Sequence, residues 1–173
     1  MKNFIAISLF FLGLTVNGQS LLNLDKDYGI ETIKLESPYS LYKNDLKNFD
    51  SDNQDLECIS YNKLDIKEVF GIPVKEINLC FINNKLYSIS INFGALTKNQ
   101  NFTLIENIKS KYDKPYITQP KFEPRVYVAA WVTDKTYLQA VEYGCSSSLH
   151  SGNRCETVLS LSYRKIIKHL PTN

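Results

Sequence analysis

The stretch that decides the fold is residues 75–93, KEINLCFINNKLYSISINF. Hydrophobic side chains alternate with mostly polar ones on both sides of two asparagines, Asn83 and Asn84. The alternating residues are Ile77, Leu79 and Phe81 before the asparagines, and Tyr87, Ile89, Ile91 and Phe93 after them. A period of two is typical of strands that bury one face, and Asn tolerates the left-handed conformation of tight turns. The stretch therefore predicts an antiparallel hairpin.

The length of the turn decides which residues face each other across this hairpin. A two-residue turn would set Leu79 opposite Ser88 and mix the two kinds of side chain on each face. A three-residue loop shifts the register by one and sets Leu79 opposite Tyr87 or Ile89. Because the second register separates an apolar face from a polar one, we expect it, with Cys80 on the polar face.

The N-terminus has the pattern of a secretory signal peptide. Lys2 is followed by an apolar run over residues 4–14, and Val16 and Gly18 are small enough for a cleavage site. We predict a signal peptide over residues 1–18 and a single domain over residues 19–173; the alternative is a buried N-terminal helix. No later apolar run is long enough to span a membrane, so we expect no transmembrane segment after cleavage. The abundance of Asn, Lys and Ile indicates a bacterial source.

The net charge and the cysteine content further limit which class of protein the sequence can encode. The formal net charge is +2, and removal of Lys2 with the signal leaves +1, which gives no reason to expect nucleic-acid binding. Four cysteines in a secreted chain suggest disulfides, with three possible connectivities. Cys58 and Cys80 both occupy the more polar faces of their strands, and Cys145 and Cys155 flank a polar loop. We therefore predict the pairs Cys58–Cys80 and Cys145–Cys155.

The remaining elements follow from local signals. We expect strands near residues 30–35, 56–62 and 156–163, a second hairpin over residues 125–143, and a loop with two prolines over residues 117–124; residues 66–70 are ambiguous. One helix is expected from Ser37 to near Phe49, and another after a capping box at Thr97–Gln100. This order predicts an α+β fold in which an antiparallel sheet built from hairpins carries two helices on one face. In architecture alone, the layout resembles small bacterial envelope and inhibitor modules of the SmpA and beta-lactamase-inhibitor-protein kind.

Signals for catalysis or metal binding are weak. Cys145, His150 and Cys155 have the spacing C-x4-H-x4-C, with Glu142 as a conceivable fourth zinc ligand, but oxidised cysteines cannot bind zinc. The acidic run at Asp50, Asp52, Asp55 and Glu57 lacks the Gly and the final Glu of an EF-hand loop. No G-x-S-x-G motif is present, and the chain has two His. We therefore expect no metal and no cofactor.

Two groups of residues are candidates for binding. Leu149, His150 and Arg154 lie in the polar loop between Cys145 and Cys155, where a disulfide would limit the entropy lost on binding. Tyr116 and Phe122 lie in the proline-containing loop, where aromatic side chains suit contact with proteins or sugars. The alternatives are a simple spacer for the first group and cover for the sheet edge for the second.

Together these features predict a secreted or periplasmic, non-catalytic binding module whose partner is a protein or an envelope component. One alternative is a small secreted hydrolase that uses acidic residues. Another is a carrier that holds an apolar ligand between the sheet and the helices.

Cleavage of the signal peptide is the first testable prediction. Mass spectrometry of protein recovered from the medium or periplasm should show a chain that starts at or within a few residues of Gln19, because the small residues Val16 and Gly18 precede that position. Cytoplasmic protein that retains Met1 would contradict both the predicted location and the disulfide argument.

Overall fold

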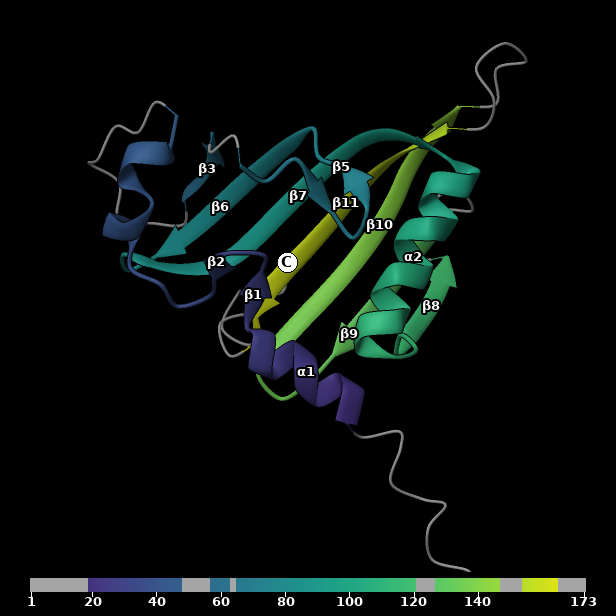
Figure 1. The fold of residues 1–173 in the computed structure, drawn as a ribbon, viewed down its shortest axis with the longest axis horizontal. Coiled ribbons are helices and arrows are strands. Elements are labelled where there is room, and N and C mark those ends of the chain that lie inside the picture. Colours follow the sequence, from purple (N-terminus) through teal and green to yellow (C-terminus); the bar gives the residue numbers. More distant parts are fainter. Residues whose placement is uncertain (1–18, 48–56, 63–64, 121–126, 147–153, 165–173) are drawn as a thin grey trace, which may run out of the picture.

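The computed structural model describes residues 19–47, 57–62, 65–120, 127–146 and 154–164 (Figure 1). Its main unit is a seven-stranded sheet with the order β3-β6-β7-β11-β10-β9-β8, in which all neighbouring strands are antiparallel. The strands are β3 (Glu57–Tyr61), β6 (Glu76–Ile82), β7 (Lys85–Thr97), β8 (Ile117–Pro120), β9 (Tyr127–Val132), β10 (Thr136–Ser146) and β11 (Arg154–Tyr163). The predicted α+β class, with a mostly antiparallel sheet and two helices, is confirmed.

Two α-helices and several short elements accompany this sheet. The helices are α1 (Gln19–Asp27) and α2 (Lys98–Tyr112), and the 3-10 helices are η1 (Tyr39–Leu41) and η2 (Lys43–Asp45). Two small hairpins pair β1 (Gly29–Ile30) with β2 (Ile33–Lys34), and β4 (Glu68–Val69) with β5 (Ile72–Pro73). In Figure 1, α2 and the β4–β5 hairpin are drawn in front of the large sheet.

Strand pairing places hydrophobic side chains in continuous rows on one face, which we call the apolar face. One row crosses six strands, and all of its members are buried: Ile59, Leu79, Ile89, Leu161, Leu138 and Trp131. Rings from η1 and from the residue that follows it lie against this face, with Tyr39 5.3 Å from Phe81 and Tyr42 6.0 Å from Tyr61 between ring centroids. Burial of such rows is the main stabilising contribution to a fold of this size.

The central hairpin has the expected register, but it reaches that register by a different turn. Asn83 and Asn84 form a two-residue turn with φ of 50° and 61°, as a type I′ hairpin requires. Cys80 pairs with Ser88 while Phe81 pairs with Leu86, so Tyr87 is an extra residue. This bulge supplies the one-residue shift, and Leu79 therefore pairs with Ile89. Our expectation of a three-residue loop was wrong.

Helix α2 forms as the sequence indicates. Thr97 and Gln100 make the predicted capping box, in which the Gln100 amide N–H donates to Thr97 Oγ1. Leu104, Ile108 and Tyr112 are buried, whereas Phe102, which was expected on the same side, is 66% exposed. At the far end the Trp131 indole donates to the Asp113 carbonyl, 2.8 Å away, and ties the helix end to β9.

Three other expectations were wrong. The helix from Ser37 to near Phe49 is replaced within the described residues by η1 and η2, because the N–H groups of Leu41, Tyr42 and Asp45 bond three residues back rather than four. The strand near residues 30–35 is instead the β1–β2 hairpin, and α1 before it was not predicted. Residues 117–120 of the expected proline loop form edge strand β8, where a terminal Pro120 is tolerated.

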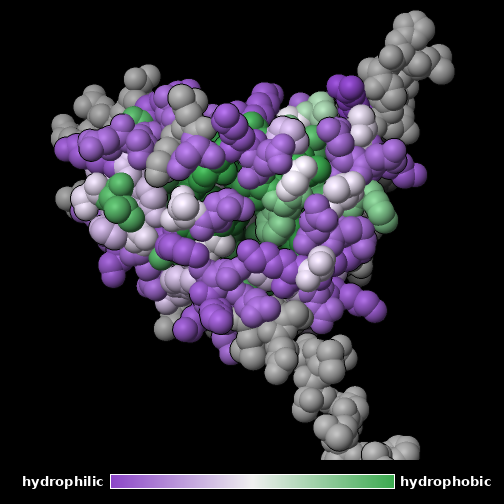
Figure 2. Space-filling view, in the orientation of Figure 1, coloured by the Kyte–Doolittle hydropathy of each residue, from purple (hydrophilic) through white to green (hydrophobic). Residues whose placement is uncertain are grey.

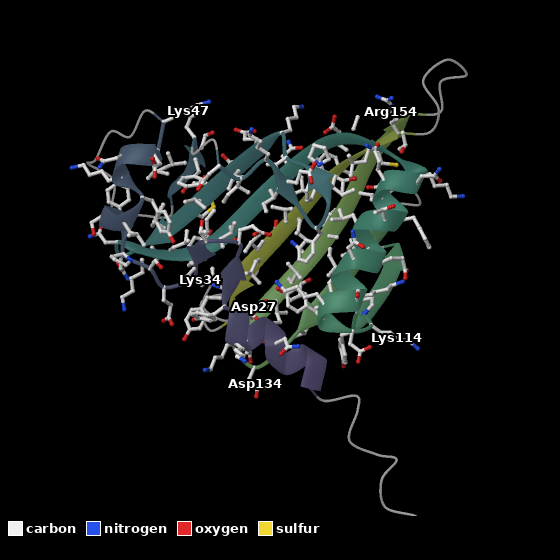
Figure 3. The ribbon with its side chains drawn as sticks, in the orientation of Figure 1. Asp27, Lys34, Lys47, Lys114, Asp134 and Arg154 are labelled. Atoms are coloured by element: carbon white, nitrogen blue, oxygen red, sulfur yellow. A yellow bond between two sulfur atoms is a disulfide. The ribbon has the colours of Figure 1, made fainter. Side chains whose placement is uncertain are left out.

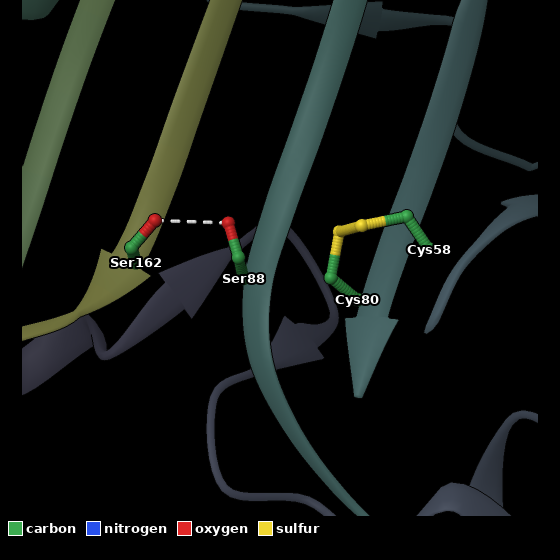
Figure 4. The surroundings of a disulfide bond; sticks show 4 residues. All are labelled: Cys58, Cys80, Ser88 and Ser162. Atoms are coloured by element: carbon green, nitrogen blue, oxygen red, sulfur yellow. Dashed lines mark hydrogen bonds between the residues drawn. A yellow bond between two sulfur atoms is a disulfide. The ribbon is translucent and has the colours of Figure 1, made fainter. Parts of the chain in front are cut away.

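The predicted Cys58–Cys80 disulfide is present, and it joins directly paired residues of β3 and β6. The cysteines are 22 positions apart. Figure 4 shows this bond beside the Ser88–Ser162 pair, whose hydroxyl oxygens are 2.9 Å apart across β7 and β11. The disulfide thus ties the edge strand β3 to the sheet.

Removal of this disulfide should lower the stability of the protein. On the chain-entropy model a loop of this size gives about 3 kcal/mol, so Cys58→Ala with Cys80→Ala should lower the free energy of unfolding by roughly that amount in urea titrations. A reductant should abolish the difference between wild type and variant. Non-reduced peptide maps that link Cys58 to Cys145 or Cys155 would contradict the pairing.

Candidate functional site

The predicted binding residues that the structure describes do not lie together. Arg154 is exposed at the start of β11 and pairs with Thr97, just before α2. Tyr116 is 81% exposed beyond the other end of α2, and its N–H donates to the Ala130 carbonyl at 2.7 Å. The 15 residues of α2 span about 22 Å, and Figure 3 shows Arg154 and Lys114 near its opposite ends. These residues therefore do not form one site.

Several predicted site residues lie outside the described residues. They are Leu149, His150 and Phe122, together with Asp50, Asp52 and Asp55 of the acidic run. Cys155 is disulfide-bonded, but its predicted partner Cys145 is outside the described side chains, so the Cys145–Cys155 pair stays a prediction. Within the described part of the chain, no group of three or more His, Cys, Asp or Glu is placed to hold a metal ion.

The face of the sheet opposite the apolar face carries small uncharged side chains, and we call it the serine face. Its central row, across five neighbouring strands, consists of Ser60, Asn78, Ser90, Ser160 and Gln139, each paired with the next. The row on one side holds Cys58, Cys80, Ser88, Ser162, Tyr137 and Val132, and the row on the other holds Glu76, Asn92, Val158, Val141 and Val128. Most of these side chains are half-buried.

The serine face has two distinct halves and very little charge. Among the described side chains of its three rows, Glu76 alone is ionisable at neutral pH. Strands β3, β6, β7 and β11 contribute mainly Ser, Asn and Cys, whereas β9 and β10 contribute mainly Val, Ala and Tyr. The face therefore offers hydrogen-bonding groups on one side and apolar area on the other.

A second candidate is a pocket of about 540 Å³. It lies where α1, the segment after the β1–β2 hairpin, the β9–β10 turn and the end of β11 meet. Figure 3 shows Asp134 at this end of the molecule, close to α1. The lining residues are Asp25, Tyr28, Glu36, Asp134, Lys135 and Tyr163. Sequence analysis did not find this pocket, because its residues are dispersed along the chain and each is an ordinary surface residue type.

A hydrogen-bond network fixes one wall of the pocket. The hydroxyls of Thr133 and Thr136 both donate to Asp25 Oδ1, the second over 2.9 Å. The Thr136 N–H donates to Thr133 Oγ1, also over 2.9 Å, and the Arg164 guanidinium donates to the Thr133 carbonyl. Because Asp25 belongs to α1 and both threonines flank the β9–β10 turn, this network attaches the helix to the sheet.

The lining of the pocket also contains two tyrosines. Tyr28 donates its hydroxyl to Glu36 Oε2 at 2.7 Å, and its ring lies edge to face with Tyr163, 6.0 Å between centroids. Burial, followed by the bond to Glu36, raises the pKa of the Tyr28 phenol above its ordinary value, so the phenol stays neutral at physiological pH.

Helix α1 is also tied to α2 at its C-terminal end. Lys111 Nζ lies 2.8 Å from Asp27 Oδ2, and the Tyr112 hydroxyl donates to the same oxygen at 2.9 Å. Burial acts to raise the pKa of Asp27, but the bonds from Lys111 and Tyr112 outweigh it and lower the pKa. The position of α1, and hence of the pocket wall, is therefore fixed from two sides.

The side of the molecule seen in Figure 2 is mostly hydrophilic, with hydrophobic residues visible in a hollowed band across its middle. Among the described helices, none combines the length and hydrophobicity needed to cross a membrane.

Comparison with known proteins assigns no family to the chain. No family model, no curated protein and no solved structure matches it.

The role of Asp25 as an anchor can be tested by two variants. Asp25→Ala leaves the Thr133 and Thr136 hydroxyls without their acceptor, so we expect the free energy of unfolding to fall by about 1–3 kcal/mol. Asp25→Asn keeps an acceptor oxygen and should retain most of that stability. Urea titrations, with amide hydrogen exchange of α1, measure both effects. Equal losses in the two variants would show that the charge of Asp25, rather than its acceptor oxygen, fixes the helix.

Proposed function

We propose that the protein is a secreted or periplasmic, non-catalytic binding module, and that it binds a protein through the serine face. The observation that carries this proposal is the near absence of charge on that face. The whole chain is 22% charged residues, yet the three described central rows of the serine face contain Glu76 alone, and Glu156, which pairs with Tyr143, lies one row beyond them. Depletion of charged residues is the compositional signal of an interface core.

We also infer that both helices pack on the apolar face and leave the serine face to a partner. Several contacts support this arrangement: ring pairs join Tyr39 to Phe81 and Tyr28 to Tyr163, and the Trp131 indole bonds the Asp113 carbonyl. Phe81, Tyr163 and Trp131 all belong to the apolar face, because they alternate along their strands in step with its buried rows. An antiparallel sheet with one free face commonly presents polar side chains there, and on most such faces these include charged ones.

The chemistry of the face favours a protein over other envelope components. Val128, Val141 and Val158 are half-buried and adjacent across three strands, and they offer apolar area that a hydrated polymer would not cover well. The neighbouring Ser160 and Gln139 offer hydrogen-bond groups next to that area. A partner surface that mixes apolar and uncharged polar groups is therefore the best match.

The proposed location is supported by the Cys58–Cys80 disulfide, since disulfides persist in oxidising compartments. Cys58 is exposed at the edge of the sheet, where a reducing environment would reach it readily.

The two alternatives receive less support. In the pocket, the carboxylates of Asp25 and Glu36 each have one oxygen held by hydroxyl groups. This does not favour a hydrolase. The pocket is lined by charged residues and tyrosines, which does not favour a carrier of apolar ligands.

A charge placed in the centre of the serine face should prevent binding. Ser160→Asp should weaken capture of the envelope partner by at least tenfold, because a buried unpaired charge costs several kcal/mol at an interface. The measurement is a quantitative pull-down from native envelope extract with the mature protein, followed by titration of the captured partner.

The matched control places the same group elsewhere. Thr103→Asp adds a carboxylate at an exposed position of α2 and should leave binding unchanged. If the Ser160 variant binds as well as wild type, the serine face is not the interface. Retention on purified cell-wall glycan, rather than capture of a protein, would contradict the class of partner.

A further inference from the structure

The pocket at α1 carries a charge opposite to that of the chain. Asp25, Glu36 and Asp134 contribute three negative charges and Lys135 one positive charge, which gives −2, whereas the whole chain is formally +2. A concave site with this excess attracts cations and excludes anions, since low-dielectric walls concentrate the field.

Two of the carboxylates have capacity left for a ligand. Asp25 uses Oδ1 to accept both threonine hydroxyls, and Glu36 uses Oε2 to accept the Tyr28 hydroxyl. Among the described residues, no hydrogen bond reaches Asp25 Oδ2 or Glu36 Oε1. Each residue is therefore held in place through one oxygen while the other can accept from a bound donor.

The aromatic walls specify the kind of cation. Tyr28 and Tyr163 meet edge to face at 6.0 Å, so the two ring planes are nearly perpendicular, at 87°. Ring faces attract organic cations, and both tyrosines line the pocket. The described carboxylates are not grouped as metal ligands, so the ring pair and the charge together fit an organic cation better than a metal ion.

We propose that this pocket binds the ammonium or guanidinium group of an organic ligand, with Glu36 and Asp134 as charge partners and Tyr163 as an aromatic wall. The same chemistry is present in a free diamine and in a Lys or Arg side chain of a polypeptide. Tyr163 is two residues after Leu161 on β11 and therefore belongs to the apolar face. The pocket and the serine face thus lie on different sides of the sheet. The proposal is therefore independent of the proposed function.

The first experiment compares a cation with an uncharged molecule of the same shape. Cadaverine and 1,5-pentanediol are titrated into the full mature protein and followed by calorimetry and by amide chemical shifts. We expect cadaverine to bind at least tenfold more tightly, with shifts centred on α1 and the β9–β10 turn. Equal affinity, or shifts elsewhere, would overturn the proposal. N-acetyl-lysine amide as a third probe distinguishes the sources: binding tighter than cadaverine indicates a polypeptide side chain, and weaker binding a free amine.

Single variants test the named residues. Glu36→Gln and Asp134→Asn should each weaken cadaverine binding about three- to tenfold, and Lys135→Gln should tighten it by a similar factor, because each changes one charge in the pocket. Glu36→Gln keeps an acceptor for Tyr28, so the fold should be preserved. Tyr163→Leu should weaken binding about two- to fivefold through loss of a cation–π contact.

The matched control is Glu106→Gln, which removes a carboxylate from the exposed side of α2 and should leave the affinity unchanged. A uniform effect of all three carboxylate variants would mean that only the net charge of the protein matters, and a Lys135 variant that weakens binding would reverse the proposed sign. Either result would overturn the assignment.

Discussion

The pairing of β7 with β11 is the contact on which the rest of the sheet depends. β7 ends the first half of the chain, with β3 and β6, and β11 ends the second half, with β8, β9 and β10. Across this seam Ile89 pairs with Leu161 and Ile91 with Leu159, and all four are fully buried. Without it, the halves would be sheets of three and four strands, each with an exposed hydrophobic edge prone to aggregation. Because the partners are distant in sequence, the seam also carries most of the entropic cost of closing the chain.

The same seam explains why the centre of the serine face carries short, uncharged side chains. Ser88, Ser90, Ser160 and Ser162 form two adjacent pairs across it, and one of these pairs is hydrogen-bonded through its side chains. Short side chains that satisfy one another leave little protruding above the strands. Larger polar residues at these positions could also make hydrogen bonds, but they would protrude further from the sheet. Ser88 is buried and the other three serines are half-buried, which is compatible with the close approach of a protein that we propose.

Local sequence signals predicted those elements of the fold that local interactions determine. Alternation and the two asparagines indicated the β6–β7 hairpin with Leu79 opposite Tyr87 or Ile89, and the structure has the second of these. Alternation together with the cysteine count indicated the Cys58–Cys80 bond, and the capping box located the start of α2. The missed elements are those that tertiary contacts stabilise. Helix α1 is held by hydrogen bonds from Thr133 and Thr136, and no sequence signal near α1 predicts these bonds. Strand β8 forms because it pairs with β9, although it contains a proline. The pocket could not be predicted from the sequence for the same reason. Its six lining residues span more than a hundred positions, and only the folded sheet brings them together.

The two candidate surfaces differ in the forces that would govern binding, although one sheet supports both. For the proposed binding at the serine face, the low charge of its central rows predicts association that depends on shape, apolar area and hydrogen bonds, with a rate that varies little with salt. In the pocket, the carboxylates of Asp25, Glu36 and Asp134 act over several ångströms, so the proposed binding of a cation should weaken as ionic strength rises. The pocket also depends on the fixed position of α1, which the Asp27–Lys111 and Asp25–Thr136 contacts hold from two sides. Loss of either contact would loosen the pocket wall without disturbing the strand pairs of the serine face, so the two surfaces can be separated by mutation.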